Sequence, residues 1–352
     1  MLLSSLAFSF MLFAPQVPVH EGPETPKPEA QPAVEGQSAF WKLQTKLVDG
    51  EWLVDEHFTR KIIHSFVNGP GSACIYVETR DKAKLSNPLP GLRVIFPDPR
   101  SGKLRGIEIA DRGAFSESVY RWEGEMLIRE YSYHLSDGSM RNGEVLESTM
   151  DLITHWSFEG SSAYTWELFQ KTKAGVSMLL ETSFAKQESL TTLPKADQTP
   201  VKPSVPLTFL DPLRADHRAS DKWFMTTDWR VKGMGLWVNR NMPNPNFGWD
   251  QTSPKILEVE GFYYWHPIEK TAKFIGFSKQ GALVEGVTQV NGRQQIETNY
   301  TVGQTSSSKP ALDAKPNPLG ERIQTMEDGS LKFTWVSVGM DGKPTITEAT
   351  MK

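Results

Sequence analysis

The chain has 352 residues, enough for two domains of ordinary size that each bury a hydrophobic core. Its 38 basic and 42 acidic residues give a net charge of −4, without the basic excess of a nucleic-acid-binding surface, so we expect no nucleic-acid partner. The single cysteine excludes an intramolecular disulfide and a cysteine-based metal cluster.

The N-terminal residues 1–14 form an apolar run that is too short to span a bilayer as a helix but has the length of a signal-peptide core. The run lacks a basic residue, and Pro15 directly follows Ala14, so an uncleaved anchor or a misassigned start are the alternatives. We expect a secreted or periplasmic protein without an integral membrane span. Residues 15–37 are rich in Pro and Glu and predict a disordered tether.

The first globular region spans residues 38–186. Residues 41–47 favour a short helix that ends at Asp49-Gly50, and the following short runs are apolar or alternate with period two, which is typical of strands. Turn signals separate the runs at spacings too short for helical crossovers, so antiparallel pairing is expected. The predicted strands are residues 61–67, 73–78, 92–96, 104–109, 114–122, 125–134, 162–169 and 176–184.

A Pro-rich linker, residues 187–207, separates this region from a second globular region, residues 208–352. The same kind of pattern recurs there, interrupted by polar inserts at 239–254 and 303–320. The predicted strands are residues 222–229, 235–239, 255–265, 272–277, 282–290, 293–302, 322–326, 331–338 and 345–350. The sequence therefore predicts an all-β protein with two tandem antiparallel β-barrel domains.

An internal duplication relates the two regions. At a constant offset of 168 residues, eight identical pairs fall within about thirty residues, whereas unrelated sequences match at roughly one position in twenty. Residues 159–166 also match residues 328–335 at an offset of 169. The eight pairs are Pro99/Pro267, Ile107/Ile275, Gly113/Gly281, Ala114/Ala282, Glu117/Glu285, Val119/Val287, Gly124/Gly292 and Ile128/Ile296.

A β-hairpin lies at the centre of the duplicated segment. Asn291-Gly292 is a strong signal for a two-residue type I′ turn, and Glu123-Gly124 occupies the same place in the first copy. The turn fixes the pairing of the two strands. The predicted opposite pairs are Val290 with Arg293, Val287 with Ile296, Glu285 with Thr298, Leu283 with Tyr300, Val119 with Ile128, Glu117 with Glu130, and Phe115 with Ser132.

Glu117, Glu130 and Glu285 are the candidate catalytic residues. Glu117 shares a sheet face with Phe115 and Val119, so it points into the barrel if that face is the interior. Two facing carboxylates in a low-dielectric site would raise one pKa, as acid–base catalysis or binding of a hard cation requires. The alternative is that the opposite face, with Tyr120 and Trp122, forms the core.

Other chemical motifs are weak. The seven histidines show neither HxxxH nor HxH spacing, so the sequence predicts no metal site and no cofactor. His266 is more typical of a hydrogen-bonded turn histidine than of a ligand contact. The loop 246–250, with Trp249, is either a lid over a barrel mouth or a surface insert.

Residues 255–302 resemble the small lipocalin-like (calycin) β-barrel domains of exported bacterial proteins. The resemblance rests on the segments 261–267 (GFYYWHP) and 273–281 (KFIGFSKQG), followed by Glu285-Gly286 and the turn at Asn291-Gly292. It implies a cup-shaped antiparallel barrel that binds a small apolar ligand. It brings no catalytic residues with it.

Three hypotheses for the function follow. The first is an exported protein that binds a small hydrophobic or amphipathic molecule inside aromatic-rich barrels; the second is a cyclase-, isomerase- or hydrolase-type enzyme that uses the glutamates; the third is a structural module with filled barrels. The sequence does not indicate an oligomeric state. The candidate ligand-binding residues are Phe115, Val119, Trp237, Trp249, Tyr264, Trp265, His266, Leu283 and Tyr300.

Overall fold

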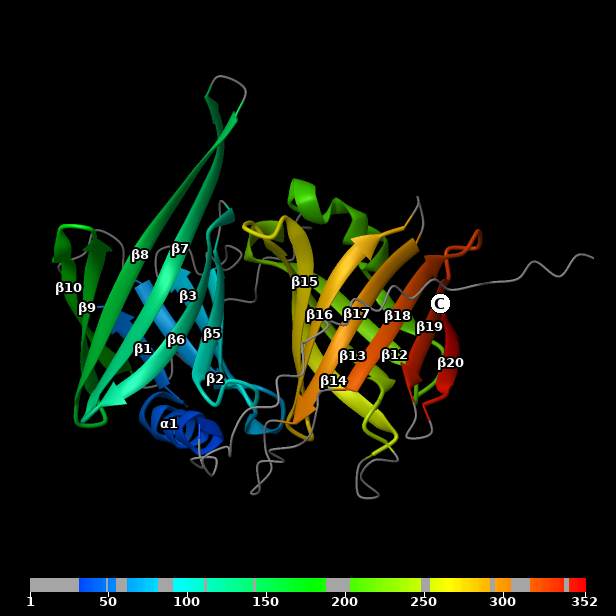
Figure 1. The fold of residues 1–352 in the computed structure, drawn as a ribbon, viewed down its shortest axis with the longest axis horizontal. Helices are drawn as coiled ribbons and strands as arrows, with labels where there is room; N and C mark the ends of the chain where they lie inside the picture. Colours follow the sequence, from blue (N-terminus) through cyan, green and yellow to red (C-terminus); the bar gives the residue numbers. More distant parts are fainter. Residues whose placement is uncertain are drawn as a thin grey trace, which may run out of the picture. The chain divides into compact units, whose positions relative to one another are not determined.

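The computed structural model describes residues 32–48, 50–54, 62–81, 91–110, 113–141, 144–187, 203–247, 254–291, 295–304, 317–338 and 342–352. Residues Pro32–Lys352 form one compact unit. The predicted signal-like segment, most of the tether and most of the 187–207 linker lie outside the described residues. Strands dominate the described chain, as the sequence predicts (Figure 1).

The first barrel is a closed sheet of ten antiparallel strands. Neighbouring strands follow one another along the chain, and β1 pairs with both β2 and β10 to close the ring. Its strands are β1 (Gly50–Val54), β2 (Ile62–Asn68), β3 (Ile75–Asp81), β4 (Gly91–Pro97), β5 (Leu104–Ala110), β6 (Phe115–Glu123), β7 (Met126–Arg141), β8 (Glu144–Glu159), β9 (Ala163–Thr172) and β10 (Gly175–Gln187).

The second sheet also has ten antiparallel strands in chain order. Its two ends meet where Arg218 and Lys352 exchange backbone N–H···O hydrogen bonds of 2.9 and 3.3 Å. The prediction of two antiparallel barrels is therefore confirmed. The strands are β11 (Asp216–Arg218), β12 (Phe224–Arg230), β13 (Gly235–Pro243), β14 (Ile256–His266), β15 (Thr271–Ser278), β16 (Ala282–Val290), β17 (Gln295–Gln304), β18 (Asn317–Thr325), β19 (Leu331–Val338) and β20 (Pro344–Met351).

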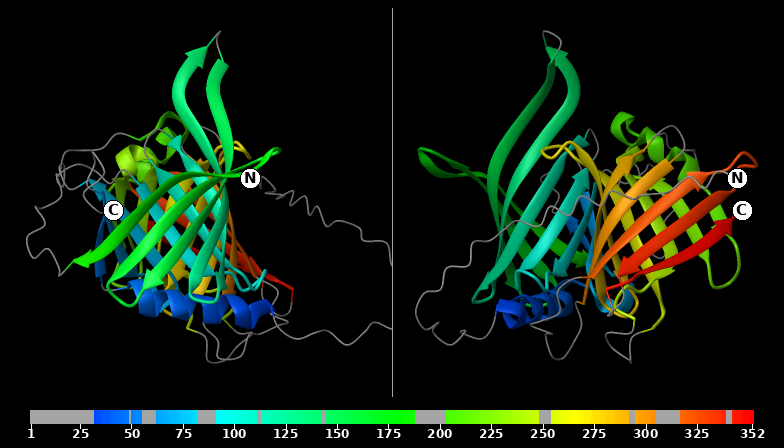
Figure 2. Two further views of the ribbon diagram at one scale, coloured as in Figure 1. Left: turned by 90° about the vertical axis from the view of Figure 1, so that its left-hand side faces the viewer. Right: turned by 45° about the vertical axis from the view of Figure 1, so that its right-hand side comes forward.

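A helical segment plugs one end of each barrel (Figures 1 and 2). Helix α1 (Pro32–Leu47) buries Phe40, Leu43 and Leu47 completely, because the i, i+3 and i+7 spacing puts them on one face. The 3₁₀ helix η4 (Val205–Leu213) buries three leucines at every third position, the repeat of a 3₁₀ helix. Helix α1 begins inside the predicted tether, so the tether is shorter than residues 15–37.

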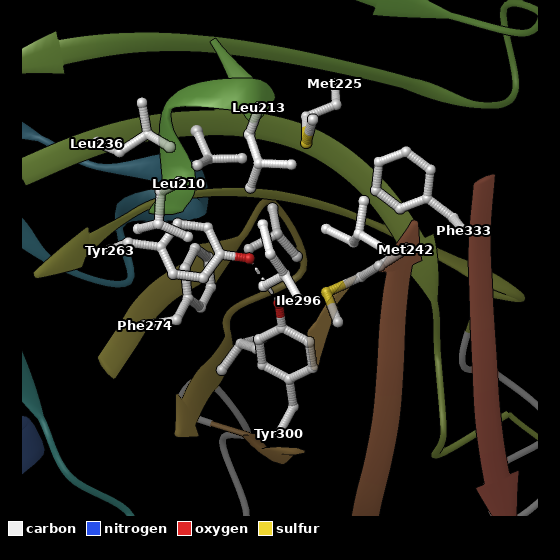
Figure 3. Close-up of a cluster of buried hydrophobic side chains, with 14 of the residues drawn as sticks. Leu210, Leu213, Met225, Leu236, Met242, Tyr263, Phe274, Ile296, Tyr300 and Phe333 are labelled. Carbon is white, nitrogen blue, oxygen red and sulfur yellow. Dashed lines mark hydrogen bonds between the residues drawn. The ribbon is translucent and has the colours of Figure 1, made fainter. Parts of the chain in front are cut away.

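Each barrel has its own buried core. The first core combines the buried face of α1 with the inward side chains of the barrel, Trp52, Trp156 and Tyr164 among them. The second core is formed by η4 and inward aromatic and aliphatic side chains, which meet closely at the centre of the barrel (Figure 3). Tyr263 and Tyr300 join their hydroxyl groups there at 2.9 Å.

A third apolar cluster joins the two barrels through their outer faces. Its members come from equivalent positions 168 residues apart, and the ring contacts cross between copies: Phe96 lies 5.3 Å from Phe277, and Phe115 lies 5.7 Å from Tyr264 between ring centroids. Such reciprocal contact is the pattern of a two-fold symmetric dimer interface. The equivalent pairs are Val94/Phe262, Phe96/Tyr264, Ile107/Ile275, Ile109/Phe277 and Phe115/Leu283.

The duplication also covers the strands before Pro99, where the sequences do not align by eye. Tyr76 pairs with Val94, and Trp237 pairs with Phe262, so Tyr76 and Trp237 are equivalent at an offset of 161 residues. Their rings meet across the interface at 4.9 Å. The difference between 168 and 161 is an insertion of seven residues between β13 and β14, which hides the alignment.

The register predicted for the hairpins is wrong. In the first copy the loop is Gly124-Glu125, between the paired Glu123 and Met126, with Gly124 at φ +61°. A glycine at the first central position is the requirement of a type II′ turn, and it shifts every pair by two residues. Val119 therefore pairs with Glu130, Glu117 with Ser132, and Phe115 with His134.

In the second copy the connection is longer than two residues. Val290 pairs with Ile296, and the backbone N–H of Asn291 donates to the carbonyl of Gln295 at 2.9 Å. Gly292 and Arg293 lie outside the described residues. The pairs are shifted by three positions, so that Glu285 pairs with Thr301, Val287 with Asn299, and Leu283 with Gly303.

The predicted interior face is also wrong. Ser116, Ser118 and Tyr120 are buried inside the first barrel, whereas Val119 is 40% exposed and Val287, its equivalent, is 41% exposed. Apolar residues recur on the Phe115 face because part of that face contacts the other barrel. The alternative reading, with Tyr120 in the core, is confirmed.

Candidate functional site

Four polar side chains from neighbouring strands converge inside the first barrel. Arg93 on β4 points inward with its neighbour Ile95, a fully buried core residue, because alternate residues of a strand share a face. Glu108, Ser116 and Arg129 lie on the inward faces of β5, β6 and β7. The strands thus bring two guanidinium groups, one carboxylate and one hydroxyl together in a buried place.

Both arginines contact the same carboxylate oxygen. Arg129 Nη2 donates to Glu108 Oε2 at 2.7 Å and to Ser116 Oγ at 2.8 Å. Arg93 Nε and Nη2 donate to the same Oε2 at 3.2 and 3.0 Å. This arrangement uses only part of the two guanidinium forks, which can otherwise bind carboxylates through pairs of parallel hydrogen bonds.

Several buried donors in this cluster lack a partner among the described residues. They are Arg93 Nη1 and Arg129 Nε, together with the hydroxyl of Tyr120. Most buried polar atoms in native proteins are hydrogen-bonded, and each exception calls for an explanation such as a bound molecule. The unpaired atoms therefore mark this cluster as a candidate ligand-binding site.

The cluster carries one excess positive charge at neutral pH. The two arginines hold the pKa of Glu108 at about 2 against the opposing effect of burial, so this carboxylate is ionised. Burial, reinforced by Arg93, lowers the pKa of nearby His64 to about 3, so its imidazole is neutral. One carboxylate therefore faces two guanidinium groups.

Aromatic rings line the space around the charges. The guanidinium of Arg129 lies 3.8 Å from the centroid of the Tyr131 ring, and that of Arg93 lies 6.0 Å from the centroid of a Trp156 ring. His64 stacks on Phe184 at 4.7 Å. Aromatic walls with a few convergent polar groups are typical of small-molecule sites.

The polar cluster inside the second barrel is balanced. Arg240 Nη1 donates to both carboxylate oxygens of Glu321, at 2.9 and 2.8 Å, and its Nη2 donates to the hydroxyl of Tyr300. Trp335 Nε1 and the Tyr300 hydroxyl donate to the same carboxylate at 2.6 and 2.8 Å. One arginine and one glutamate neutralise each other there, among the packed side chains of Figure 3.

The two barrels differ at equivalent positions. Residues 168 positions after Arg93 and Glu108 are Gly261 and Gly276. A Cβ at Gly261 would lie 2.1 Å from the Ile275 carbonyl oxygen, and one at Gly276 would lie 2.8 Å from the Phe274 ring. The second barrel therefore cannot hold the charged pair where the first barrel does.

The candidate catalytic glutamates do not form the predicted pair. Glu117 and Glu130 are 44% and 48% exposed in their side chains and line a groove of about 790 Å³ on the outer surface of the first barrel. Glu130 binds Arg121. Glu285 lies at the interface between the barrels, where it binds Arg100 and comes within 3.6 Å of Arg105.

The candidate ligand-binding residues fall into three places. Phe115, Trp237, Tyr264 and Leu283 belong to the interface cluster, and Val119 is exposed on the outer face. Tyr300 and Trp265 belong to the core of the second barrel. Trp249 lies outside the described residues.

His266 is a buried turn histidine, as the sequence favours. Its Nδ1 accepts the backbone N–H of Glu269 at 3.2 Å, and its ring packs 4.7 Å from the Phe115 ring. Its Nε2 lies 3.7 Å from Glu117, and this contact is the main cause that lowers the pKa of Glu117. His266 thus belongs to the interface and not to a barrel interior.

Arg93, Glu108 and Arg129 were not among the predicted site residues. The signal that could have found them is a charge inside a strand that is otherwise apolar, such as Arg93 in Leu92–Phe96. The alternation rule alone places Arg93 and Ile95 on one face. That rule does not say which of two apolar faces points inward.

Within the described ranges, no group of three or more His, Cys, Asp or Glu side chains is placed to hold a metal ion. No helix in that part of the chain is long and apolar enough to cross a membrane. Neither a protein-family model nor a curated protein matches this chain.

Proposed function

We propose that the protein is an exported binding protein whose first barrel holds a small hydrophobic or amphipathic molecule, as lipocalin-like (calycin) barrels do. The observation that carries this proposal is the set of buried guanidinium N–H groups of Arg93 and Arg129 without a partner among the described residues. A bound molecule supplies acceptors for them. Export is supported by the apolar run of residues 1–14 alone.

The contrast between the barrels supports this assignment. The second barrel satisfies the terminal nitrogens of its buried arginine with its own side chains and fills its centre with aromatic and aliphatic groups. The first barrel leaves donors over beside aromatic walls. We therefore assign binding to the first barrel and a structural role to the second, which fits the hypothesis of a filled barrel.

The enzyme hypothesis has lost its acid–base pair, because Glu117 and Glu130 are neither opposite each other nor inside the barrel. Glu108 is no substitute. Its pKa of about 2 keeps it ionised, whereas a general acid or base works best with a pKa near the operating pH.

A binding experiment on the full chain tests the proposal. Native and denaturing mass spectra of the purified protein should differ by one retained small molecule per chain. After removal of that molecule, the neutral fluorescent probe N-phenyl-1-naphthylamine should bind saturably at one site per chain. A protein that shows neither a retained molecule nor saturable probe binding contradicts the proposal.

A matched pair of variants locates the site. Leu168 and Glu167 are neighbours on β9; Leu168 shares the inward face with its partner Thr154, whereas Glu167 pairs with His155 in a salt bridge on the outer face. Leu168→Trp should fill the interior and weaken probe binding, and Glu167→Trp should leave it unchanged. Equal binding by both variants would place the probe elsewhere.

A further inference from the structure

We propose that the cluster of Arg93, Glu108 and Arg129 binds the head group of a singly charged anionic amphiphile, of the carboxylate class, with its hydrocarbon tail inside the first barrel. This inference rests on the proposed function and goes beyond it, because it fixes the charge and the head-group chemistry of the ligand.

The charge count sets the valence of the ligand. Two guanidinium groups and one carboxylate leave one positive charge, and the side chains of Arg93, Glu108 and Arg129 are only 11%, 15% and 2% exposed. An unpaired buried charge is strongly unfavourable, whereas a monoanion neutralises it. A neutral ligand leaves the charge in place, and a dianion reverses it.

The hydrogen-bond geometry favours an acceptor group. The free atoms, Arg93 Nη1 and Arg129 Nε, are both N–H donors, and the neighbouring Tyr120 hydroxyl has no partner among the described residues either. Arginine forks match the planar pair of oxygens of a carboxylate. Both guanidiniums already share the single oxygen Oε2 of Glu108, so a second carboxylate can take the donors that Glu108 leaves.

The surroundings favour a ligand with an apolar tail. Thr154 pairs with Arg129 on one side and with Leu168 on the other, and Tyr131 pairs with Leu152, so apolar groups flank the charged cluster along the same inward face. A small inorganic anion would satisfy the charge but would leave these groups without a ligand. The two possibilities share the anionic group and differ in the tail.

Calorimetric titration of the stripped full-length protein with three probes separates these cases. The probes are dodecanoate, dodecan-1-ol and acetate, which vary the charge and the tail independently. Dodecanoate should bind roughly 10- to 100-fold more tightly than dodecan-1-ol, the range expected for a hydrogen bond to a charged group. Acetate should bind more weakly than dodecanoate.

Three variants test the residues. Arg93→Met removes the excess charge and should weaken dodecanoate binding roughly 10- to 100-fold while leaving dodecan-1-ol binding unchanged. Glu108→Gln adds a second unpaired positive charge and should strengthen dodecanoate binding roughly tenfold. A gain of affinity cannot come from a misfolded protein. Arg121→Met, on the exposed outer face of β6, is the matched control and should change nothing.

The outcomes distinguish this inference from the proposed function. Equal affinity for dodecanoate and dodecan-1-ol overturns the anionic head group but leaves a binding barrel. Acetate binding as tight as dodecanoate binding overturns the amphiphile. Weaker dodecanoate binding by Glu108→Gln overturns the charge argument. Absence of binding of all three probes, together with absence of N-phenyl-1-naphthylamine binding, overturns both proposals.

Discussion

Buried arginines occur inside both barrels, but their balance of charge differs. Arg240 is matched one to one with Glu321, and the surrounding hydroxyl and indole groups complete the hydrogen bonds. Arg93 and Arg129 share one acceptor, Glu108. Breaking a buried ion pair costs several kcal/mol, so a persistent excess of one charge inside a fold is informative about what else binds there.

His64 gives the first barrel a pH dependence above the range of its carboxylates. Burial, with Arg93 as the second cause, lowers its pKa from 6.5 to about 3. The unfolded chain takes up a proton below pH 6.5 and the folded chain does not, so stability falls as the pH drops. Glu108, with a pKa of about 2, loses its contribution only below pH 4.5.

The substitution His64→Phe should remove this dependence while it keeps the stacking on Phe184. Between pH 7 and pH 5 the wild-type free energy of unfolding should fall by about 2 kcal/mol because of His64, and the variant should lack this part. Urea unfolding followed by circular dichroism at several pH values measures it. The lowered pKa of His217 leaves a residual slope in both proteins. Identical slopes in the two proteins would contradict the assignment.

At the scale of elements, α1 acts as a plug and not as a surface helix. Trp122 Nε1 donates to the Ala39 carbonyl at 3.0 Å, and Trp52 Nε1 donates to the Leu47 carbonyl at 3.2 Å, so indole groups of the barrel anchor both halves of the helix. Lys42 and Lys46 bind Glu125 at the hairpin turn at 2.8 and 2.9 Å. The helix therefore closes the end of the barrel opposite to no charged cluster but directly on the apolar core.

Leu43→Ala should destabilise the protein by about 2–5 kcal/mol, because its side chain is fully buried between α1 and the barrel core. Trp41→Ala, two residues away on the same helix but 58% exposed, should change stability by about 0.5 kcal/mol or less. The midpoints of urea unfolding of the two variants measure the difference. Similar midpoints would mean that α1 does not contribute to the cooperative core.

The sequence predicts most of the strands because their apolar residues alternate or cluster between turn signals. It misses β8, where Thr154 interrupts the inward apolar pattern, and β11, which has only three polar residues. The hairpin register fails because one glycine fits two turn types. Gly124 takes the first central position of a two-residue loop, and the choice between these positions depends on strand pairing.

The interior and the site are harder to predict for one physical reason. Strands such as β4 carry apolar residues on both faces, because one face packs in the barrel and the other packs against the second barrel. Pattern alone cannot tell these two kinds of burial apart. The cluster of Arg93, Glu108 and Arg129 also depends on contacts between strands that are distant in the sequence, whereas the duplication and the antiparallel barrels follow from local patterns.

At the scale of the whole molecule, the symmetry of the interface makes equivalent substitutions comparable. Ile107 and Ile275 are buried at equivalent positions in the interface and point out of their own barrels. Either residue changed to Asp should separate the barrels without unfolding them, because an unpaired carboxylate cannot stay in this apolar contact. Val119→Asp and Val287→Asp, at exposed equivalent positions, are the controls.

Small-angle scattering and far-ultraviolet circular dichroism together measure this effect. The Ile variants should show a larger radius of gyration with unchanged β-sheet signal, and the Val variants should match the wild type. Loss of the β-sheet signal in the Ile107→Asp and Ile275→Asp variants would show that the interface belongs to the cores of the barrels and not to their surfaces.

The two-fold contact between the barrels has a further consequence, because one chain carries both halves. In separate subunits such faces meet only above their dissociation constant, whereas a covalent connection holds them at an effective concentration on the order of millimolar. The contact can therefore be weak and still remain formed. It tolerates unlike residues at equivalent positions, Asp98 and His266 or Arg105 and Lys273, and it allows one barrel to specialise while the other serves as its permanent partner.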